Sequence, residues 1–209
     1  MIGSEIGVLQ YVLGFALGHV LGSVPCGLWI VKAFFGIDIR EYGSKNIGTT
    51  NVFRTVGAKT AALVMLADML KGIVAVALMN YLYADSMLNV VTALGAILGH
   101  SYSLFLGLKG GKGVATGLGI LVYLMPDASL ICFGIWLFIV LITRYVSLGS
   151  MVAGCCTPFL SWYLGYHTSY TVLCVLAAMF VVLRHKENIK RLLNGTESKI
   201  KQGNIKNVK

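Results

Sequence analysis

The residues best suited to chemistry lie in one short stretch, Gly107 to Thr116, which carries four glycines and two lysines between long apolar segments. Glycine tolerates positive φ and lets the backbone come close to a ligand, so successive N–H groups can converge on an oxyanion while Lys112 supplies positive charge. A helix that starts near Val114 would add its N-terminal dipole. The pattern predicts an anion site. A flexible turn between two membrane helices, with ordinary cytoplasmic lysines, is the alternative that this stretch alone leaves open.

The same loop excludes a nucleotide site. A P-loop has the pattern Gly-x4-Gly-Lys-Ser/Thr, but Gly107 lies one residue too close to Gly111, and Gly113 stands where a hydroxyl residue would hold magnesium. The sequence has no second acidic motif for a metal, and its four histidines are too scattered for a metal site. We therefore predict phosphate binding without a nucleotide, a metal or a cofactor.

A second polar stretch, Gly43 to Arg54, is dense in hydroxyl and amide side chains and contains no acid. Such side chains hydrogen-bond polyols and phosphates, and the guanidinium of Arg54 can bind an oxyanion in a bidentate way. A solvated connecting loop is the alternative, although such a loop usually carries acids as well as donors. The stretch is therefore a second candidate for binding a phosphate or a polyol, with Arg54 as its anion ligand.

A third candidate segment, Arg184 to Arg191, is basic and begins after the last apolar run. His185, Asn188 and Arg191 are spaced i, i+3 and i+6, which places them near one face of a helix. His185 is of a residue type that can act as a general base. The alternative is an amphipathic basic helix that lies on anionic lipid.

Composition indicates an integral membrane protein rather than a soluble basic domain. Of the 209 residues, 57% are hydrophobic and 12% charged, and the mean hydropathy is +0.80. The net charge of +9 would suit nucleic acid, but apolar runs of about 20 residues recur, the length that a bilayer core requires. We interpret the basic residues as markers of topology and of anionic ligands, and we predict no nucleic-acid partner.

The apolar runs predict an all-α, polytopic membrane protein with seven transmembrane helices in a single domain, residues 1–209. Gly22-Ser-Val-Pro25 should bend the first span, and Pro126 divides a run that is too long for one helix. Asp68 and Lys71 share a face of the second span. Ionisable residues there suggest function, but we interpret them as a structural ion pair. The expected spans are Ile6–Val31, Ala58–Tyr83, Met87–Leu106, two helices within Val114–Thr143, Ser147–Leu164 and Ser169–Leu183.

The lysines and arginines set the orientation, because cytoplasmic flanks carry them and outer loops do not. The connections near residues 83–87, 125–128 and 165–169 contain none. This predicts an N-terminus outside and a C-terminus in the cytoplasm, and since no basic residue precedes the first apolar run, we expect that run to remain uncleaved. The polar, glycine-rich stretches 36–56, 107–113, 144–150 and 184–197 then share the cytoplasmic face, where they can build one site.

Six motifs follow in one order over nearly the whole chain: Gly22–Pro25, Gly43–Arg54, Leu66–Gly72, Gly99–Thr116, Arg144–Ser150 and Arg184–Arg191. Together they resemble the membrane-integral bacterial acyl-phosphate:glycerol-3-phosphate acyltransferases, the PlsY family. The resemblance implies seven helices in the bacterial cytoplasmic (inner) membrane, an active site that faces the cytoplasm, and transfer of a fatty acyl group from acyl phosphate to the 1-hydroxyl of sn-glycerol 3-phosphate. The products would be lysophosphatidic acid and phosphate, in the first step of phospholipid synthesis.

The resemblance also implies site residues. Glycerol 3-phosphate would be surrounded by Ser44, Arg54, Lys112, Ser150, His185 and Asn188. Phosphate and other polar groups of the substrates would lie near Asn46, Thr50, Asn51, Gly110, Gly111 and Gly113. One departure is Ser103, where the family usually has proline after His-x-Tyr; it concerns the geometry that leads into the loop rather than the chemistry.

The residues fit this chemistry. Acyl phosphate is a mixed anhydride with phosphate as leaving group, so positioning and charge stabilisation can carry most of the catalysis. We expect Arg54 and Lys112 to bind phosphate, Asn188 and hydroxyls to orient the glycerol, and the glycine loop to bind the acyl phosphate head. The acyl chain would lie between apolar helices that open to membrane lipid. We assign the catalytic roles to His185, Lys112 and Ser44.

Two alternatives stay open. For the proton of the attacking hydroxyl, we rank a phosphate oxygen of the substrate above His185, because the sequence places no clear carboxylate partner beside that histidine. For the function, a transporter or channel for organic phosphate would share the basic pocket and the apolar helices. Against transport, the outer face offers no matching polar loops, and repeated halves are not evident.

Overall fold

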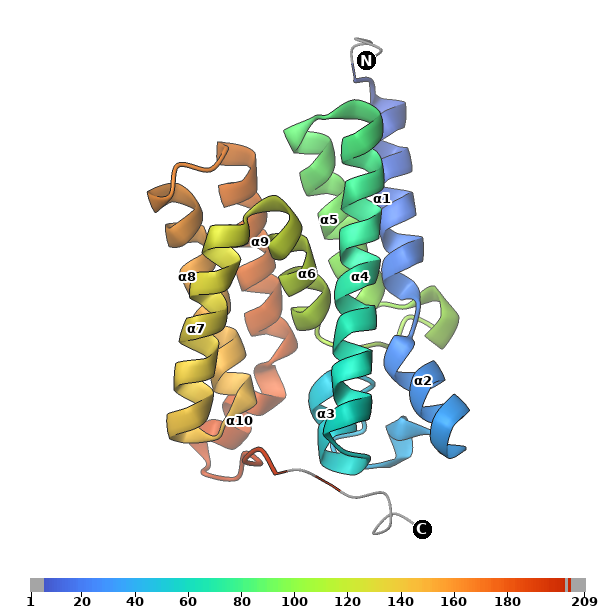
Figure 1. Ribbon diagram of the computed structural model, residues 1–209, viewed down its shortest axis with the longest axis vertical. Coiled ribbons are helices and arrows are strands. Elements are labelled where there is room, and N and C mark those ends of the chain that lie inside the picture. The colour runs from blue at the N-terminus through green and yellow to red at the C-terminus, as the bar shows by residue number, and fades with distance from the viewer. Residues whose placement is uncertain (1–5, 202, 204–209) are drawn as a thin grey trace.

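The computed structural model of the protein describes residues 6–201 and 203, and all regular secondary structure in that part of the chain is helical (Figure 1). The all-α prediction is therefore confirmed. Two short 3₁₀ turns, η1 (Ile39–Glu41) and η2 (Leu104–Leu106), accompany the α-helices. The helices are α1 (Val8–Ser23), α2 (Cys26–Phe35), α3 (Thr49–Thr55), α4 (Ala58–Tyr83), α5 (Ser86–Ser101), α6 (Val114–Leu124), α7 (Pro126–Thr143), α8 (Val146–Tyr163), α9 (Thr168–Arg184) and α10 (Lys186–Leu193).

Proline accounts for two of the breaks between helices. Val24 and Pro25 separate α1 from α2, because proline lacks an N–H and disfavours helical geometry in the residue before it. The bend expected in the first span is thus a break between two helices. Pro126 is the first residue of α7, a position where the missing N–H has no helical partner to lose. The predicted division of the run from Val114 to Thr143 is confirmed.

Four segments of the described chain are long and apolar enough to cross a membrane: Val8–Phe35, Ala58–Tyr83, Ser86–Leu106 and Pro126–Thr143. A fifth is counted if α9 and α10, which are bent by 59°, form one span. Helix α6 has 11 residues, so it is about 16 Å long at 1.5 Å per residue, against about 30 Å for the hydrocarbon core. The length and composition of the helices therefore do not confirm the prediction of seven transmembrane helices.

Small residues let α1 pack directly on α5. A side chain at Gly18 would collide with the carbonyl oxygen of Thr92, and a side chain at Gly22 would collide with that of Ala96. Helices in lipid associate through such close backbone approach, because moving apolar side chains from lipid to protein contributes little. This contact fixes the position of α5 along α1, and with it the start of the glycine loop that follows α5.

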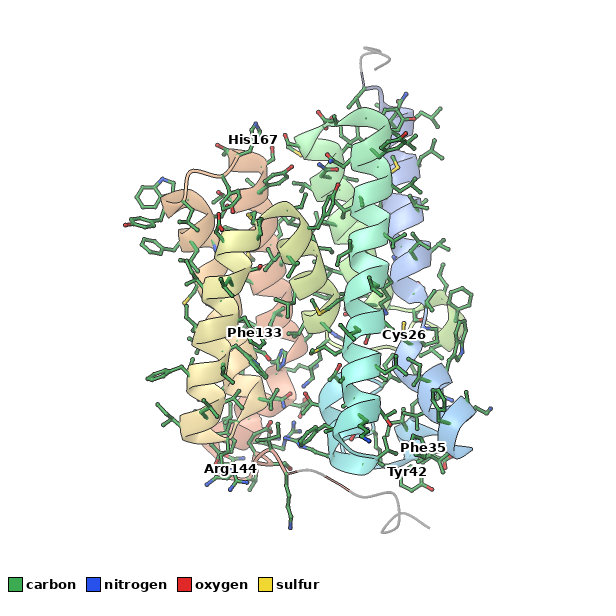
Figure 2. The ribbon with its side chains drawn as sticks, in the orientation of Figure 1. Cys26, Phe35, Tyr42, Phe133, Arg144 and His167 are labelled. Atoms are coloured by element: carbon green, nitrogen blue, oxygen red, sulfur yellow. The ribbon has the colours of Figure 1, made fainter. Side chains whose placement is uncertain are left out.

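Helix α6 lies between the two halves of the bundle (Figure 1). A buried cluster joins it to α4, α5 and α9: Ala75, Val76, Val90, Ala93, Ala96, Ile97, Ile120 and Leu173. Figure 2 places Tyr42 and Arg144 at the end of the bundle that carries α3 and α10, and His167 at the opposite end. The polar loops that contain Tyr42 and Arg144 therefore lie at one end of an apolar bundle.

Candidate active site

Glu197, in the tail after α10, lies at the centre of the polar end. The residue as a whole is 8% exposed. Oε1 accepts hydrogen bonds from Ser147 Oγ and Asn188 Nδ2, both at 2.7 Å, and Oε2 accepts one from Arg191 Nε at 2.7 Å. Burial opposes ionisation of Glu197, but these three hydrogen bonds keep its pKa below the usual value of 4.5. One anionic side chain thus joins α8, α10 and the tail.

Lys112, from the glycine loop, donates to Asn188 Oδ1 on α10. Burial lowers the pKa of Lys112 to about 8; Glu197 opposes this shift and Arg191, Arg54 and Arg184 add to it. Each neighbouring cation destabilises the protonated form of Lys112. Binding of an anion beside the lysine would stabilise that protonated form. The amide of Asn188 is held on one side by Lys112 and on the other by Glu197.

Arg54, on α3, approaches the same region from the other side. Its Nη2 donates to the carbonyl oxygen of Ser198 at 2.7 Å, one residue after Glu197. Burial lowers the pKa of Arg54, and its buried Nε has no hydrogen-bond partner among the described residues. The guanidinium therefore keeps an unused donor close to the tail, suited to a phosphate oxygen.

His185 directly follows α9, as its C-cap, and is 3% exposed. Its Nδ1 lies 2.7 Å from the carbonyl oxygen of Val181. A carbonyl can only accept, so Nδ1 carries the proton and Nε2 of the neutral ring is left as an acceptor. Burial lowers the pKa of His185 to about 4, and Lys112 contributes to the shift. The imidazole is therefore neutral at pH 7, with a lone pair available for a hydroxyl donor.

Asn51 organises the loop that leads into α3. It is 1% exposed, and its Oδ1 accepts from the backbone N of Ser44 at 2.8 Å. Its Nδ2 donates to the carbonyl oxygens of Ile39, Tyr42 and Asn46. The amide of Asn51 is fully used inside the loop, which it shapes so that Ser44 is exposed.

Two of the three other predicted residues of this loop and of α8, Asn46 and Ser150, have local hydrogen-bond partners. The Oδ1 of Asn46 accepts from Gly48 N at 2.8 Å, and Thr50 is half-buried in the first turn of α3. Ser150 is buried in α8, where its hydroxyl donates to Val146 O at 2.9 Å. Substrate contacts of these three residues stay predictions.

The glycine loop is held by α5 and α9. Gly111 N donates to the carbonyl oxygen of His100 at 3.1 Å, and Gly111 O accepts from Arg184 Nη2 at 2.9 Å. Gly113 has φ 79° and caps the N-terminus of α6, a left-handed geometry that glycine adopts without strain. The dipole of α6 therefore begins directly after Lys112. Among the described residues, no three His, Cys, Asp or Glu side chains are placed to hold a metal ion.

A family model for glycerol-3-phosphate acyltransferase matches residues 12–195. The chain belongs to the glycerol-3-phosphate acyltransferase family. It is 43% identical to the glycerol-3-phosphate acyltransferase of Fusobacterium nucleatum over 88% of this chain and 95% of that relative. It is 46% identical to the enzyme of Syntrophomonas wolfei over 88% of this chain and 94% of that relative.

The fold of this acyltransferase family member agrees with solved structures. The glycerol 3-phosphate form of PlsY (YgiH), an integral membrane glycerol 3-phosphate acyltransferase, matches with a TM-score of 0.86 and 37% identity, over 91% of this chain and 96% of that one. Its lysophosphatidic acid form matches with a TM-score of 0.85. The chain is thus an integral membrane protein, and the resemblance inferred from its motifs is confirmed.

Glu197 is the residue of this acyltransferase that the sequence analysis missed as part of the site. Its signal was weak: a single acid six residues after Arg191, in a segment whose other charges are mostly basic. Two predicted site residues converge around it, since Asn188 binds its carboxylate and Arg54 binds the next carbonyl, and Arg191, from the predicted helix face, also binds the carboxylate. Lys112 joins the group through Asn188.

Gly111→Ala tests whether the glycine loop needs its close contact with α5. A Cβ at Gly111 would collide with the imidazole of His100, so the ring or the loop must move. We expect acyl transfer to fall about 100-fold, the loss that a misplacement of about 1 Å can cause, and the unfolding free energy to fall by about 1–3 kcal/mol. Thermal unfolding and initial rates in detergent measure both. Gly134→Ala, whose Cβ would meet nothing within 4 Å, is the control, and equal losses in the two variants would contradict the prediction.

Proposed function

We propose that the protein transfers a fatty acyl group from acyl phosphate to the 1-hydroxyl of sn-glycerol 3-phosphate, giving lysophosphatidic acid and phosphate. The observation that carries the proposal is the convergence of Lys112, Arg54 and Asn188 beside a glycine loop at one end of an apolar bundle. Two phosphate-bearing substrates, one soluble and one lipidic, need a cationic site at the boundary between water and lipid. The relatives named glycerol-3-phosphate acyltransferase support the acceptor.

We assign the two phosphates to different parts of the site. Arg54 and Lys112 bind the phosphate of glycerol 3-phosphate, and Asn188, Ser44 and Ser150 orient its glycerol hydroxyls. The N–H groups of Gly110 and Gly113 bind the head of acyl phosphate, with the N-terminal dipole of α6 behind them, whereas the N–H of Gly111 is held by the carbonyl oxygen of His100. The acyl chain lies among the apolar helices and extends into membrane lipid. No metal, cofactor or nucleotide takes part.

The reaction exchanges one acyl–oxygen bond for another. The 1-hydroxyl oxygen attacks the acyl carbonyl carbon, the bond from that carbon to the phosphate oxygen breaks, and inorganic phosphate leaves with its electron pair. A phosphate oxygen of glycerol 3-phosphate takes the hydroxyl proton. Positive charge from Lys112 and the loop N–H groups stabilises the developing negative charge on the departing phosphate.

His185→Gln separates positioning from base catalysis. A base is most effective when its pKa lies near the working pH, and the pKa of His185 is lowered to about 4. We therefore expect His185 to orient the attacking hydroxyl through Nε2, and the variant to keep kcat within about 10-fold while KM for glycerol 3-phosphate rises. Complete loss of kcat at unchanged KM would instead identify His185 as the base. His167→Gln, at the opposite end of the bundle (Figure 2), is the matched control.

The deciding assay uses purified protein in detergent with acyl phosphate and glycerol 3-phosphate. We expect release of inorganic phosphate in step with formation of lysophosphatidic acid. Acyl-coenzyme A offered in place of acyl phosphate tests the donor, and equal turnover with it would refute the assignment of the donor. No phosphate release, together with uptake of glycerol 3-phosphate by sealed vesicles, would favour an organic-phosphate transporter instead.

We further propose seven crossings of the bacterial cytoplasmic membrane within one domain, with the N-terminus outside and the site facing the cytoplasm. Support comes from the alternating directions of α1, α4, α5, α6, α7, α8 and α9 along the bundle (Figure 1) and from the basic residues at the site end. The short α6 lies inside the bundle, where protein rather than lipid can surround the chain near its ends. Labelling single cysteines at Lys45 and His167 from each side of sealed vesicles tests the orientation.

A further inference from the structure

Three ionisable side chains lie beneath the glycine loop without a part in the proposed reaction. Asp68 and Lys71 come from α4 and His100 from α5, and all three residues are buried. Lys71 Nζ lies 2.7 Å from Asp68 Oδ1 and donates to the carbonyl oxygen of Val24 at 2.8 Å. His100 Nδ1 lies 3.5 Å from the same carboxylate oxygen. The cluster thus ties α4 to α5 and to the break between α1 and α2.

Asp68 and Lys71 interact mainly through their opposite charges rather than through a well-directed hydrogen bond. Asp68 Oδ1 makes both close contacts, yet it has no well-directed hydrogen bond to a described residue. Ionisable groups at membrane depth are costly, and a buried ion pair is often replaced by apolar residues without loss of stability. Stability alone therefore does not explain why this pair is placed here.

His100 connects the cluster to the loop. Its carbonyl oxygen accepts from Gly111 N at 3.1 Å, and its Nε2 edge lies so close to Gly111 that a side chain there would collide with it. On the other edge of the ring, Nδ1 lies 3.2 Å from Thr116 Oγ1 in the first part of α6. The ring is therefore fixed on one side by Asp68 and Thr116, while its other side supports Gly111.

We propose that Asp68, neutralised by Lys71, is a positioning residue for acyl transfer: it holds the imidazole of His100, which supports Gly111, so that the glycine loop keeps the N–H of Gly110 in place for the head of acyl phosphate. The inference rests on the proposed function, since it assigns acyl phosphate to this loop. Asp68 acts through His100 and does not touch substrate. The groups proposed for glycerol 3-phosphate are joined instead to Glu197 and Ser198 in the tail.

The test is the double variant Asp68→Asn/Lys71→Met, which removes both charges and leaves neither partner buried alone. We expect thermal unfolding and the Kd for glycerol 3-phosphate, from calorimetry, to stay close to wild type, while kcat/KM for acyl phosphate falls about 10- to 100-fold. Asn89→Leu is the control, because Asn89 is also buried and polar on α5 and bonds to Asn80 and Tyr170 away from the loop. Unchanged acyl phosphate kinetics in the double variant would overturn the proposal, and so would equal impairment of both substrates.

A second variant keeps the proposal testable if the double variant does not fold. His100→Asn places an amide near the position of Nδ1 and removes the part of the ring that lies under Gly111. We expect the same selective loss toward acyl phosphate, and normal acyl phosphate kinetics would overturn the proposal. Wild-type protein is assayed in parallel. Absence of transfer by the wild type would refute the proposed function itself, whereas normal transfer by the wild type leaves the variants to test the role of Asp68 alone.

Discussion

Replacing Lys112 with methionine is expected to lower kcat/KM for glycerol 3-phosphate about 100- to 1000-fold, as removal of one donor from an oxyanion site typically does. Methionine resembles lysine in length and suits a half-buried position, but it removes the cation and the donor to Asn188 Oδ1. Initial rates of phosphate release in detergent measure the effect. Lys186→Met is the matched control, since Lys186 is exposed on α10. A Lys112→Met variant with near-normal kinetics would remove this lysine from the site.

The pH dependence of binding checks the same assignment. The pKa of Lys112 is lowered to about 8, so the protonated form that attracts phosphate is lost as the pH rises through about 8. Glycerol 3-phosphate stays a dianion there, because the second pKa of a phosphate monoester is about 6. We expect the Kd for glycerol 3-phosphate, from calorimetry, to rise about tenfold per pH unit well above pH 8. The reason is that the protonated fraction of Lys112 falls about tenfold with each pH unit there. In Lys112→Arg this rise should disappear, and a persistent rise would assign the titration to another group.

The helices could largely be predicted because apolar length and proline act locally. Helix α4 has the predicted bounds, Ala58 and Tyr83, and Pro126 divides α6 from α7. Whether α6 crosses the membrane was harder to predict, because its 11 residues are apolar but fall short of the length of a bilayer core. The pairing of Asp68 with Lys71 was predicted from their spacing on one helix face and is confirmed.

Contacts between residues that lie far apart in the sequence could not be predicted from it. The spacing of His185, Asn188 and Arg191 predicts one shared face, and Asn188 and Arg191 do bind one carboxylate. His185 lies one turn earlier at the junction of α9 and α10, where it bonds to Val181 instead. Similarly, nothing in the spacing around His100 shows that its ring lies against Gly111, because that contact forms only when the loop folds back on α5.

Glu197 shows why the tail escaped prediction. It follows α10 in an irregular segment, where no periodicity relates a residue to a face. The tail reaches α3 and the connection between α7 and α8 by backbone bonds: Gly203 N donates to Phe53 O at 3.0 Å, and Ile200 N donates to Arg144 O at 2.8 Å. These bonds lay the segment across the polar end of the bundle. The buried carboxylate that balances the cations of the site can therefore come from an irregular segment such as this tail, provided that the segment is long enough to reach the site.

Glu197→Ala is expected to lower kcat/KM about 100-fold and to reduce the unfolding free energy by about 2–3 kcal/mol, because charged hydrogen bonds from Arg191, Asn188 and Ser147 are lost together. Without the carboxylate, the amide of Asn188 is no longer held toward Lys112. The pKa of Glu197 is lowered, so its stabilisation is present above its usual value of 4.5 and is lost as the pH falls through the lower folded value. Thermal unfolding from pH 7 to pH 3 and initial rates at pH 7 measure these effects.

Glu187→Gln is the control for the Glu197 variant, because Glu187 is an exposed acid on α10. Calorimetry with glycerol 3-phosphate then decides what the carboxylate does in the folded protein. If Glu197 organises the ligands, Glu197→Ala binds glycerol 3-phosphate more weakly than wild type, since Asn188 and Arg191 lose their common partner. Tighter binding would contradict this assignment. It would mean that the carboxylate competes with the substrate phosphate for Lys112 and Arg54, so that the tail must withdraw before glycerol 3-phosphate can bind.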